Sequence, residues 1–274
     1  MRLQNKVAIV TGGTSGMGKA TVKCFIEEGA TVVLTGRSEE IGQQIATELG
    51  GQCHFLRTDV SNPSDVEHMI DWSKNQFGRI DCLFNNAGAG ENVNNIEEVT
   101  PEQIHREFDL LVVAVLMGMK HVVPIMKEQG GGSIINNASI AGIASGYGPL
   151  VYSVAKAAVI QATKWVAMEV ASNGIRVNSI SPGAVYTPIF AKIWDPEGKD
   201  AEKTETRVRQ AMSEIVPVGR PGDGDEVGSL LTFLASDESR YITGQDIAID
   251  GGITTGLTLK QMEQNFSILT DAMS

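Results

Sequence analysis

The chain has 274 residues, of which 42% are hydrophobic and 20% are charged, and its formal net charge is −11. This length suits one large α/β domain or two small ones. The acidic balance argues against a nucleic-acid-binding surface, which needs a basic patch. The three cysteines, Cys24, Cys53 and Cys82, contain no CxxC pair, so the sequence predicts neither a disulfide framework nor a zinc site.

The sequence has no pattern typical of export or of membrane insertion. The opening residues, MRLQNKVAIVTGG, are not typical of a signal peptide. The most apolar stretch, residues 110–119, is half as long as the ~20 residues that a membrane span needs. We therefore expect a cytoplasmic protein without membrane contact, in which residues 110–119 form a buried helix.

Apolar strand-like runs alternate with helical patterns along the chain. Strands are predicted at residues 6–12, 30–36, 53–60, 80–88, 132–139, 175–183 and 244–252. Helices are predicted at residues 19–29, 38–50, 62–78, from 100 onward, and 151–172. The strands are continuous apolar runs, which is typical of a sheet covered on both faces. This alternation predicts an α/β fold with a doubly wound parallel sheet and helices on both faces.

No linker rich in proline, glycine or serine divides the chain, so we assign residues 1–256 to a single domain and residues 257–274 to a C-terminal tail. Residues 186–226 interrupt the alternation and mix charges with large apolar side chains. They follow the carboxyl end of a strand, where such sheets bind ligands. We interpret residues 186–226 as a substrate-binding lid, and the alternative is a surface decoration.

A glycine-rich turn follows the first strand and opens the first helix. The sequence VTGGTSGMGKA, residues 10–20, contains the pattern TGxxxGxG. Glycines allow a tight turn and a close approach of bare backbone to a pyrophosphate, and the helix start adds free N–H groups. In this strand–turn–helix context the pattern predicts a dinucleotide site. The candidate cofactor-binding residues here are Gly12, Thr14, Ser15, Gly16, Met17 and Gly18.

The end of the second predicted strand indicates which dinucleotide is bound. NAD sites usually place an acidic residue there, to hold the ribose 2′-hydroxyl. Here Gly36 stands at that position, and Arg37 and Ser38 follow. An arginine can pair with a 2′-phosphate through its planar fork. We therefore favour NADP(H), with NAD(H) as the alternative, and we expect Asp59 and its neighbour Val60 to contact the adenine.

The sequence YSVAK, residues 152–156, places one phenol and one ammonium on the same face of an apolar helix, because residues four apart are neighbours. A phenol titrates near ~10 in water, so a base that works near neutrality needs a much lower pKa. We expect the positive charge of Lys156, together with the cationic nicotinamide of an oxidised cofactor, to lower the pKa of Tyr152 by favouring the phenolate. Ser139, at the end of the fifth strand, could hold a substrate oxygen while Tyr152 moves the proton.

These motifs together resemble the short-chain dehydrogenase/reductase family over nearly the whole chain. Besides Ser139, the matching segments are residues 11–18 (TGGTSGMG), 59–60 (DV), 85–88 (NNAG), 152–156 (YSVAK), 175–188 (IRVNSISPGAVYTP) and 242–252 (ITGQDIAIDGG). The resemblance implies a seven-stranded Rossmann sheet and hydride transfer between a nicotinamide and a secondary alcohol or ketone. It also implies that Ser139, Tyr152 and Lys156 are catalytic.

The resemblance also places cofactor contacts along the chain. It assigns the adenosine and ribose side to Asn86, Ala87 and Gly88, and the nicotinamide half to Pro182, Gly183, Val185 and Thr187. Tyr152 and Lys156 would also contact the cofactor.

One position departs from the family pattern. Members usually carry an asparagine in the long fourth helix, where it holds a water that links the lysine to solvent. Here the segment reads FDLLVVAV, and Leu111 stands at the asparagine position. Either another polar group, such as Asn137, takes over the relay, or the enzyme is slow, or the protein binds the cofactor without catalysis. We favour catalysis because Ser139, Tyr152 and Lys156 are all present.

The candidate substrate contacts are mostly apolar. Besides Ser139, they are Ala141, Ile143, Tyr147, Leu150, Ile189, Phe190 and Trp194. No cluster of arginines or lysines awaits a carboxylate or a phosphate. The sequence therefore predicts a hydrophobic small-molecule substrate, a cyclic alcohol or ketone included. The rival functions are a non-catalytic nicotinamide sensor or scaffold, motivated by Leu111, and an epimerase, disfavoured because nothing resembles a nucleotide-sugar site.

Two predicted helices, residues 151–172 and 108–123, carry few charges on any side. A helix that is apolar all round must be buried all round, so we expect a homo-oligomer. The family resemblance implies a homotetramer in which these helices pair. In the tail, Leu259, Met262 and Phe266 recur at helical intervals. The tail could pack on a neighbouring subunit, close the active site, or fray.

Overall fold

The computed structural model describes residues 1–90, 95–188, 195 and 197–273. Seven parallel strands form one sheet in the order β3-β2-β1-β4-β5-β6-β7. The strands are β1 (Val7–Val10), β2 (Thr31–Gly36), β3 (Cys53–Arg57), β4 (Cys82–Asn85), β5 (Gly132–Asn137), β6 (Ile175–Pro182) and β7 (Asp246–Ile249). All seven predicted strands and the predicted fold class are confirmed. The order reverses between β1 and β4, which opens a crevice at their carboxyl ends.

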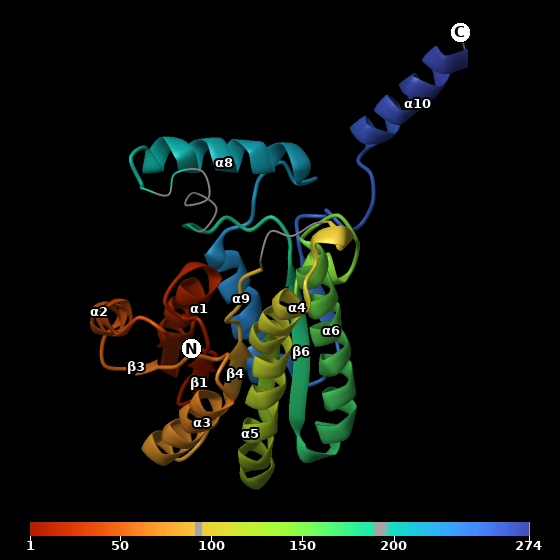
Figure 1. Ribbon diagram of the computed structural model, residues 1–274. Helices are drawn as coiled ribbons and strands as arrows, with labels where there is room; N and C mark the ends of the chain where they lie inside the picture. Colours follow the sequence, from red (N-terminus) through yellow and green to blue (C-terminus); the bar gives the residue numbers. More distant parts are fainter. Residues whose placement is uncertain (91–94, 189–194, 196, 274) are drawn as a thin grey trace.

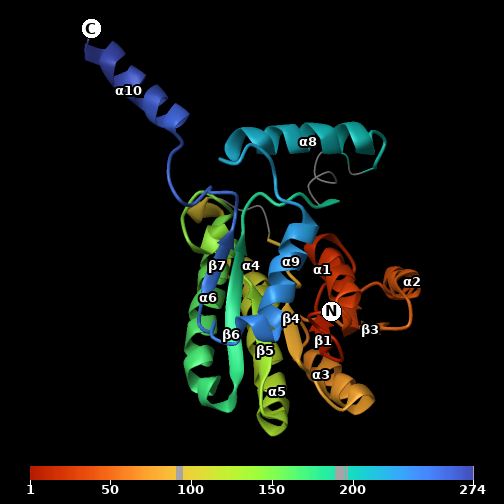
Figure 2. The same cartoon turned by 180° about the vertical axis from the view of Figure 1, so that it is seen from behind.

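Helices cover both faces of the sheet (Figures 1 and 2). The α-helices are α1 (Gly16–Glu27), α2 (Glu39–Leu49), α3 (Pro63–Phe77), α4 (Pro101–Phe108), α5 (Ala114–Gln129), α6 (Leu150–Val170), α8 (Ala201–Ile215), α9 (Gly224–Ala235) and α10 (Leu259–Met273). Short 3-10 turns are η1 (Ile96–Glu98), η3 (Ile140–Gly142), η4 (Ala171–Asn173) and η5 (Asp237–Ser239). The ends follow local chemistry: Asn62 caps α3 and Pro63 begins it, while Gly78 ends it in a left-handed conformation.

The core has two layers, one on each face of the sheet. On one face, strand residues such as Ile9 and Leu83 pack against α3, α5 and α6 in one buried cluster. On the other face, Val10 and Phe84 pack against α1, α2 and α9 in a second cluster. Successive strand residues point to opposite faces, so each strand supplies both layers. This explains why the strand sequences are apolar throughout.

The long fourth helix is not uniform. α4 and α5 are joined by a π-helical turn, η2 (Asp109–Val113). Such bulges are rare and occur often at functional sites. The whole segment Pro101–Gln129 is long and apolar enough, by length and composition alone, to cross a membrane. It packs against the sheet instead, with the side chains of Val122 and Met126 fully buried, as expected for a core helix.

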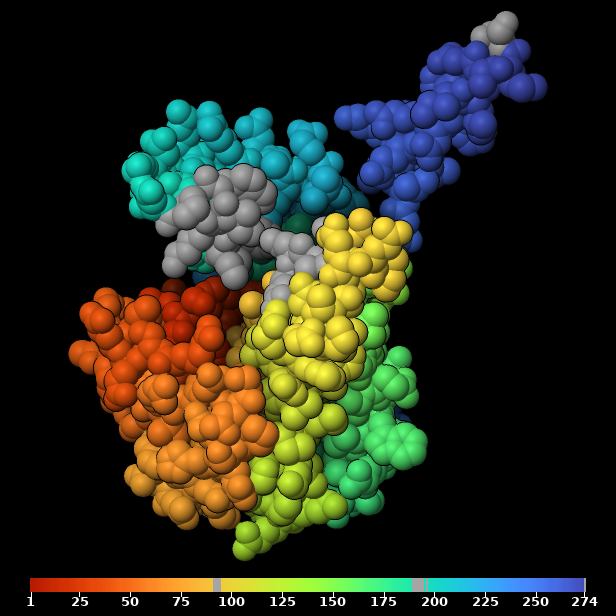
Figure 3. All heavy atoms as spheres, viewed as in Figure 1, coloured from red at the N-terminus to blue at the C-terminus, as the bar shows by residue number. Residues whose placement is uncertain are grey.

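Two helices lie outside this layered body. α8 occupies part of residues 186–226 and lies above the carboxyl ends of the strands in both ribbon views (Figures 1 and 2). α10 confirms the helical pattern of the tail, and it projects away from the rest of the chain (Figure 3). None of its residues is buried, and Phe266 is 67% exposed. Within this one chain, α10 does not close over the strand ends.

Candidate active site

The glycine turn lies between β1 and α1, where the sequence predicted it. Gly12 and Gly16 have positive φ angles of 64° and 50°, which side chains rarely adopt. A Cβ on Gly18 would collide with the carbonyl oxygen of Gly12. Ser15 precedes α1 without capping it through its side chain, so the first N–H groups of the helix face the turn. This arrangement is a cradle for a phosphate.

Three segments distant in sequence meet at this turn. The Thr11 hydroxyl accepts hydrogen bonds from the backbone N–H groups of Asn86, at 2.8 Å, and Ala87, at 3.0 Å. The Asn86 amide donates to the Thr11 carbonyl oxygen at 2.8 Å. A Cβ on Gly16 would lie 3.2 Å from Cγ2 of Thr187, in the segment after β6. The predicted cofactor residues of β1, β4 and β6 therefore converge.

The second strand ends beside the same turn. A Cβ on Gly36 would lie 2.8 Å from Cγ2 of Thr14. Arg37 and Ser38 follow on the surface, and the Ser38 hydroxyl accepts a hydrogen bond from the N–H of Ile41 at 3.4 Å. Arg37 acts on Asp59 through its charge, without a hydrogen bond or ion pair to a described residue, and it follows Gly36, where the sequence predicted a contact with the ribose 2′-phosphate.

Asp59 lies in the loop after β3, which ends at Arg57, not in the strand as predicted. Its carboxylate accepts hydrogen bonds from the hydroxyl of Ser61, at 2.7 Å, and from its N–H, at 3.1 Å. These bonds, helped by the charges of Arg37 and Arg57, hold the pKa of Asp59 below its usual value. The carboxylate is therefore an ionised acceptor near the glycine turn. Val60 is buried in the core beneath it.

The residues predicted to contact the nicotinamide half of the cofactor follow β6. Pro182 is the last residue of that strand, and Gly183 packs so tightly that a Cβ would lie 2.6 Å from Cβ of Asp250. Val185 is buried and pairs with Gly222 in an isolated bridge. The chain is thereby held as it passes the glycine turn at Thr187.

Ser139, Tyr152 and Lys156 come together at the carboxyl end of β5. Ser139 lies just beyond the strand and begins η3, with its hydroxyl accepting a hydrogen bond from the N–H of Ala141 at 3.2 Å. Lys156 is 3% exposed, and its Nζ donates to the carbonyl oxygen of Asn137 at 2.6 Å. The same Nζ lies 5.4 Å from the centroid of the Tyr152 ring. The three predicted catalytic side chains are therefore neighbours.

The pKa values differ from the sequence-based expectation. Burial raises the pKa of Tyr152, hydrogen bonding to Ser139 opposes this rise, and the charge of Glu107 adds to it. The expected lowering by Lys156 is wrong for the protein by itself, because the ammonium points to the Asn137 carbonyl and the phenol is desolvated. Burial also lowers the pKa of Lys156, to about 8.

Leu111 lies in the π-helical turn and packs with Tyr152 and Ala155. A Cβ built on Gly88 would lie 2.7 Å from Cδ2 of Leu111 and 3.8 Å from Nζ of Lys156. Leu111 and Nζ of Lys156 thus both lie near Gly88, and the leucine adds an apolar side chain to this part of the site.

Asn137 offers a polar group at the same place. Its side-chain N–H donates to Oδ1 of Asn86 at 3.2 Å, and its backbone carbonyl accepts from Lys156. Its Oδ1 is buried and has no hydrogen-bond partner among the described residues. A buried acceptor without a partner is costly, so it indicates a hydroxyl donor that binds here, from a ligand or from water.

Two residues of the site escaped the sequence analysis. Glu107 is 3% exposed and close enough to Tyr152 to affect its pKa. The available signal was its place four residues before Leu111, on the same face of an apolar helix. Thr11, which ties the glycine turn to β4, is the threonine of the TGxxxGxG pattern but was not among the residues predicted to bind the cofactor.

The substrate candidates are placed in part. Ala141 is buried, and a Cβ on Gly148 would lie 2.9 Å from its Cβ and 3.1 Å from Cδ1 of Tyr152. Tyr147 is 43% exposed, and its hydroxyl lies 3.4 Å from the carbonyl oxygen of Ile253. Ile143 is 46% exposed. Leu150 is the first residue of α6. The other three predicted contacts, Ile189, Phe190 and Trp194, lie outside the described residues.

The residues at this edge of the sheet fit a nicotinamide dinucleotide. The glycine cradle suits a pyrophosphate, the unpartnered Oδ1 of Asn137 suits a hydroxyl donor, and Tyr152 suits proton transfer. Among the described residues no group of three or more His, Cys, Asp or Glu side chains could hold a metal ion.

Comparison with known proteins shows similarity over almost the whole chain. A family model described as enoyl-(acyl carrier protein) reductase matches residues 12–254. The 3α-(or 20β)-hydroxysteroid dehydrogenase of Mycobacterium bovis is 39% identical over 93% of this chain and 92% of its own length. The cyclohexanol dehydrogenase of an Acinetobacter species is 34% identical over 93% and 97%.

A solved structure is similar throughout. L-sorbose reductase from Gluconobacter frateurii, in complex with NADPH and L-sorbose, superposes with a TM-score of 0.87 and 33% identity, over 94% of this chain and all of that one. The fold, the glycine turn and the full-length similarity lead to one conclusion: the chain belongs to the short-chain dehydrogenase/reductase family, nicotinamide-dependent oxidoreductases that act on secondary alcohols and ketones.

Proposed function

We propose that this protein transfers a hydride between NADP(H) and a hydrophobic secondary alcohol or ketone, cyclic ones included. The observation that carries the proposal is the meeting of Ser139, Tyr152 and Lys156 beside the glycine turn, at the carboxyl edge of the sheet. A bound nicotinamide supplies the hydride acceptor in oxidation and the hydride donor in reduction.

The protein's own residues would manage the proton. The Ser139 hydroxyl holds the substrate oxygen, and Tyr152 gives a proton to it in reduction or takes one from it in oxidation. Lys156 is held in position by its hydrogen bond to the Asn137 carbonyl oxygen, and it would place a positive charge near the Tyr152 phenol. Because burial raises the pKa of Tyr152, the phenol is protonated at neutral pH, which is the form that reduction needs. Oxidation should gain from alkaline pH.

The preference for NADP(H) rests on Arg37. Its guanidinium follows Gly36, which lies against Thr14 of the glycine turn, and no acidic residue stands at the position of Gly36. An arginine–phosphate pair is a strong charge-assisted contact. Arg37→Gln is expected to weaken NADPH binding about 10- to 100-fold and to leave NADH binding nearly unchanged. Fluorescence titration with both cofactors measures this, and an equal effect on both would refute the assignment.

The proposed substrate class rests on the apolar residues predicted around Tyr152 and on the substrates in the names of two relatives. Ala141 and Tyr152 both lie against Gly148, and residues 186–226 are the predicted lid. Two relatives are named for a cyclohexanol and for a hydroxysteroid, while the similar solved structure holds a sugar. We therefore expect cyclic hydrophobic ketones to be reduced better than L-sorbose.

We further infer a homotetramer in the cytoplasm. α6 exposes Trp165 at 72% and Met168 at 67%, an apolar surface that a second subunit would cover. The three cysteines are unpaired, as in a reducing compartment. Size-exclusion chromatography with light scattering measures the mass directly.

The deciding experiment combines cofactor titration with turnover of a panel of cyclic alcohols and ketones. The dehydrogenase proposal requires turnover that Tyr152→Phe abolishes without loss of NADPH binding. Binding of NADPH with no turnover of any panel member would overturn it.

A second candidate function is a catalytically weakened nicotinamide sensor or scaffold. The observation that favours it is Leu111, which lies beside Lys156 where a polar group would normally serve the proton path. A sensor would bind NADPH, turn over no substrate, and bind cofactor equally well after Tyr152→Phe. Activity that appears only in Leu111→Asn would support this candidate.

A further inference from the structure

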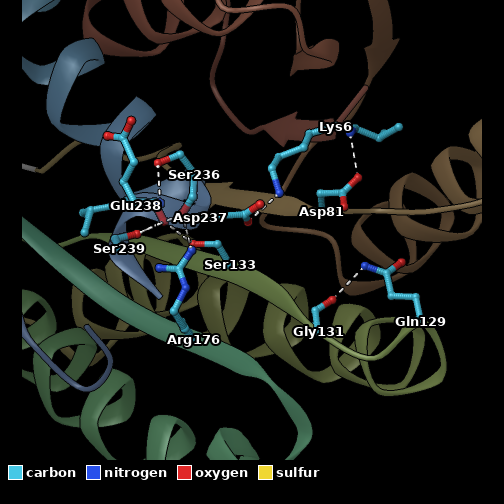
Figure 4. A network of polar contacts seen from close by, with 12 residues as sticks. Lys6, Asp81, Gln129, Gly131, Ser133, Arg176, Ser236, Asp237, Glu238 and Ser239 are labelled. Carbon is cyan, nitrogen blue, oxygen red and sulfur yellow. Dashed lines mark hydrogen bonds and ion pairs between the residues drawn. The ribbon is translucent and has the colours of Figure 1, made fainter. Parts of the chain in front are cut away.

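The sheet has a second open site at its opposite, amino edge. The segments that precede β1, β4, β5, β6 and β7 border a cleft of about 440 Å³, here named the amino-edge cleft (Figure 4). The side chains and glycines that line it include Lys6, Arg79, Asp81, Gly131, Gly174, Arg176, Asp237, Arg240 and Thr243. It lies at the ends of the strands remote from Tyr152, so the proposed hydride-transfer chemistry does not use it.

The amino-edge cleft has an excess of positive charge in an acidic protein. Four cationic side chains line it, but only two carboxylates. Asp81 accepts from Arg79 through two bonds, of 2.8 and 2.6 Å, and from the N–H of Val7 at 2.9 Å. Asp237 accepts from Lys6 at 2.9 Å. Both carboxylates are therefore already paired, and the chain as a whole carries a formal net charge of −11.

Two guanidinium groups, those of Arg176 and Arg240, feel the charge of Asp237 but form no hydrogen bond or ion pair with it, because that carboxylate pairs with Lys6. Arg176 donates through Nη2 to the carbonyl oxygen of Ser236 at 3.0 Å. Its Nη1 is buried with no hydrogen-bond partner among the described residues. The Arg240 side chain forms no hydrogen bond or ion pair with any described residue. A buried guanidinium donor without an acceptor is costly, so a bound acceptor would relieve it after a small side-chain movement.

One wall of the amino-edge cleft consists of loops that are fixed by hydrogen bonds and that expose glycine backbone. The Gln129 amide donates to the carbonyl oxygens of Ile80, at 2.7 Å, and Gly131, at 2.9 Å, which ties two loops together. A Cβ on Gly131 would lie 2.8 Å from the carbonyl oxygen of Gly174, so both loops pack with backbone against backbone. Because these glycines have no side chains, a ligand can approach the backbone of this wall directly.

We propose that the amino-edge cleft is a second binding site, which takes a small organic anion bearing carboxylate or phosphate groups. Guanidinium forks match both groups geometrically, and the other polar groups on the wall fit a ligand larger than a single oxyanion. Arg176 and Arg240 would hold the anion, and Lys6 would complete the positive field. The proposal does not depend on the substrate of the carboxyl edge.

The test is thermal unfolding of the full chain with NADPH bound, titrated with citrate as carboxylate probe and with inorganic phosphate. Sodium chloride at equal ionic strength is the reference for screening. Citrate and phosphate also stabilise proteins by exclusion from the surface, but that effect does not saturate, so only a saturable response counts as binding. A ligand that binds only the folded state raises the melting temperature with a saturable dependence on its concentration. A response to citrate alone identifies a carboxylate ligand, and a response to phosphate alone identifies a phosphorylated one.

Variants assign any response to the cleft. Arg240→Gln and Arg176→Lys, which keeps the charge but loses the fork, are expected to weaken the apparent affinity at least 10-fold. Arg207→Gln, an exposed arginine on α8, is the matched control, and Arg37→Gln controls for anions at the cofactor site. Arg240 is exposed, so its loss does not threaten folding. No saturable response beyond chloride would overturn the proposal. So would a response unchanged in both cleft variants, or one lost only in Arg37→Gln.

Discussion

At the carboxyl edge of the sheet, polar groups are left ready for a ligand, whereas at the amino edge most of them are paired with one another. Oδ1 of Asn137 has no partner within the described residues, and the Ser15 side chain does not cap α1. In contrast, Asp81 binds Arg79 and the N–H of Val7. At the amino edge this pairing stabilises the fold and leaves Arg176 and Arg240 for the proposed anion, whereas at the carboxyl edge the unpaired groups are those that the proposed function uses.

The contrast between the two edges of the sheet is tested most strongly at Tyr152. Tyr152→Phe removes the only hydroxyl positioned to exchange a proton with substrate in the proposed mechanism, so turnover is expected to fall 10²- to 10⁴-fold. The melting temperature should stay the same or rise, because the change removes a buried polar atom rather than a packing contact. Steady-state kinetics and calorimetry on the same preparation measure both. A large loss of stability would mean that the carboxyl edge is also structural.

Lys156 gives a prediction with a defined dependence on pH. Burial lowers its pKa from 10.5 to about 8, so between these values the unfolded chain binds a proton that the folded chain does not. Stability of the wild type should therefore rise with pH in this window, by about 3 kcal/mol in total, relative to Lys156→Met. Below pH 8 both states of the wild type are protonated, and the difference between the two proteins should become constant.

Urea unfolding at several pH values from 7 to 10.5, without cofactor, measures this difference. Lys164→Met, at an exposed position on the same helix, is the control and should show no such slope. A flat difference for Lys156→Met would mean that the ammonium is better solvated than its 3% exposure indicates.

The amino edge makes the opposite prediction. Asp81→Asn replaces a carboxylate that is 8% exposed and holds both Arg79 and the first strand. We expect a loss of about 2 kcal/mol in the free energy of unfolding, because a half-buried arginine and a backbone N–H lose a charged partner. Turnover per folded molecule should change less than twofold. A fall in turnover comparable to the Tyr152→Phe effect would erase the distinction between the edges.

The sequence allowed the layered fold to be predicted because its signals are local. Gly12 and Gly18 stand where only glycine fits, and the uninterrupted apolar runs require two covered faces. The ends of the strands were predicted less accurately. The third strand stops at Arg57 rather than at residue 60, and Asp59 lies in a loop where its carboxylate accepts a hydrogen bond from Ser61. That bond depends on a loop conformation, which periodicity does not encode.

The site residues were predictable as types, but their electrostatics were not. The spacing of Tyr152 and Lys156 identified the pair, yet the ammonium binds the Asn137 carbonyl, a contact between a helix and a strand that are not adjacent in sequence. The effect of Glu107 on Tyr152 likewise depends on how α4 and α6 pack. Such pKa shifts result from tertiary burial, which cannot be read from spacing alone.

The smallest expected effect is the most informative about how the carboxyl edge works without the usual asparagine. If Asn137 serves the proton path through its unpartnered Oδ1, Asn137→Ala should lower turnover about 10-fold in the wild type. In Leu111→Asn, which restores a polar group beside Lys156, the same change should cost less than threefold. Residues that share one task give non-additive effects, so this double-mutant cycle separates a relay from simple packing. The pH dependence of turnover for all four proteins is the second readout. Additive losses with an unchanged profile would mean that Asn137 only supports Asn86 and that protons reach Tyr152 by another route.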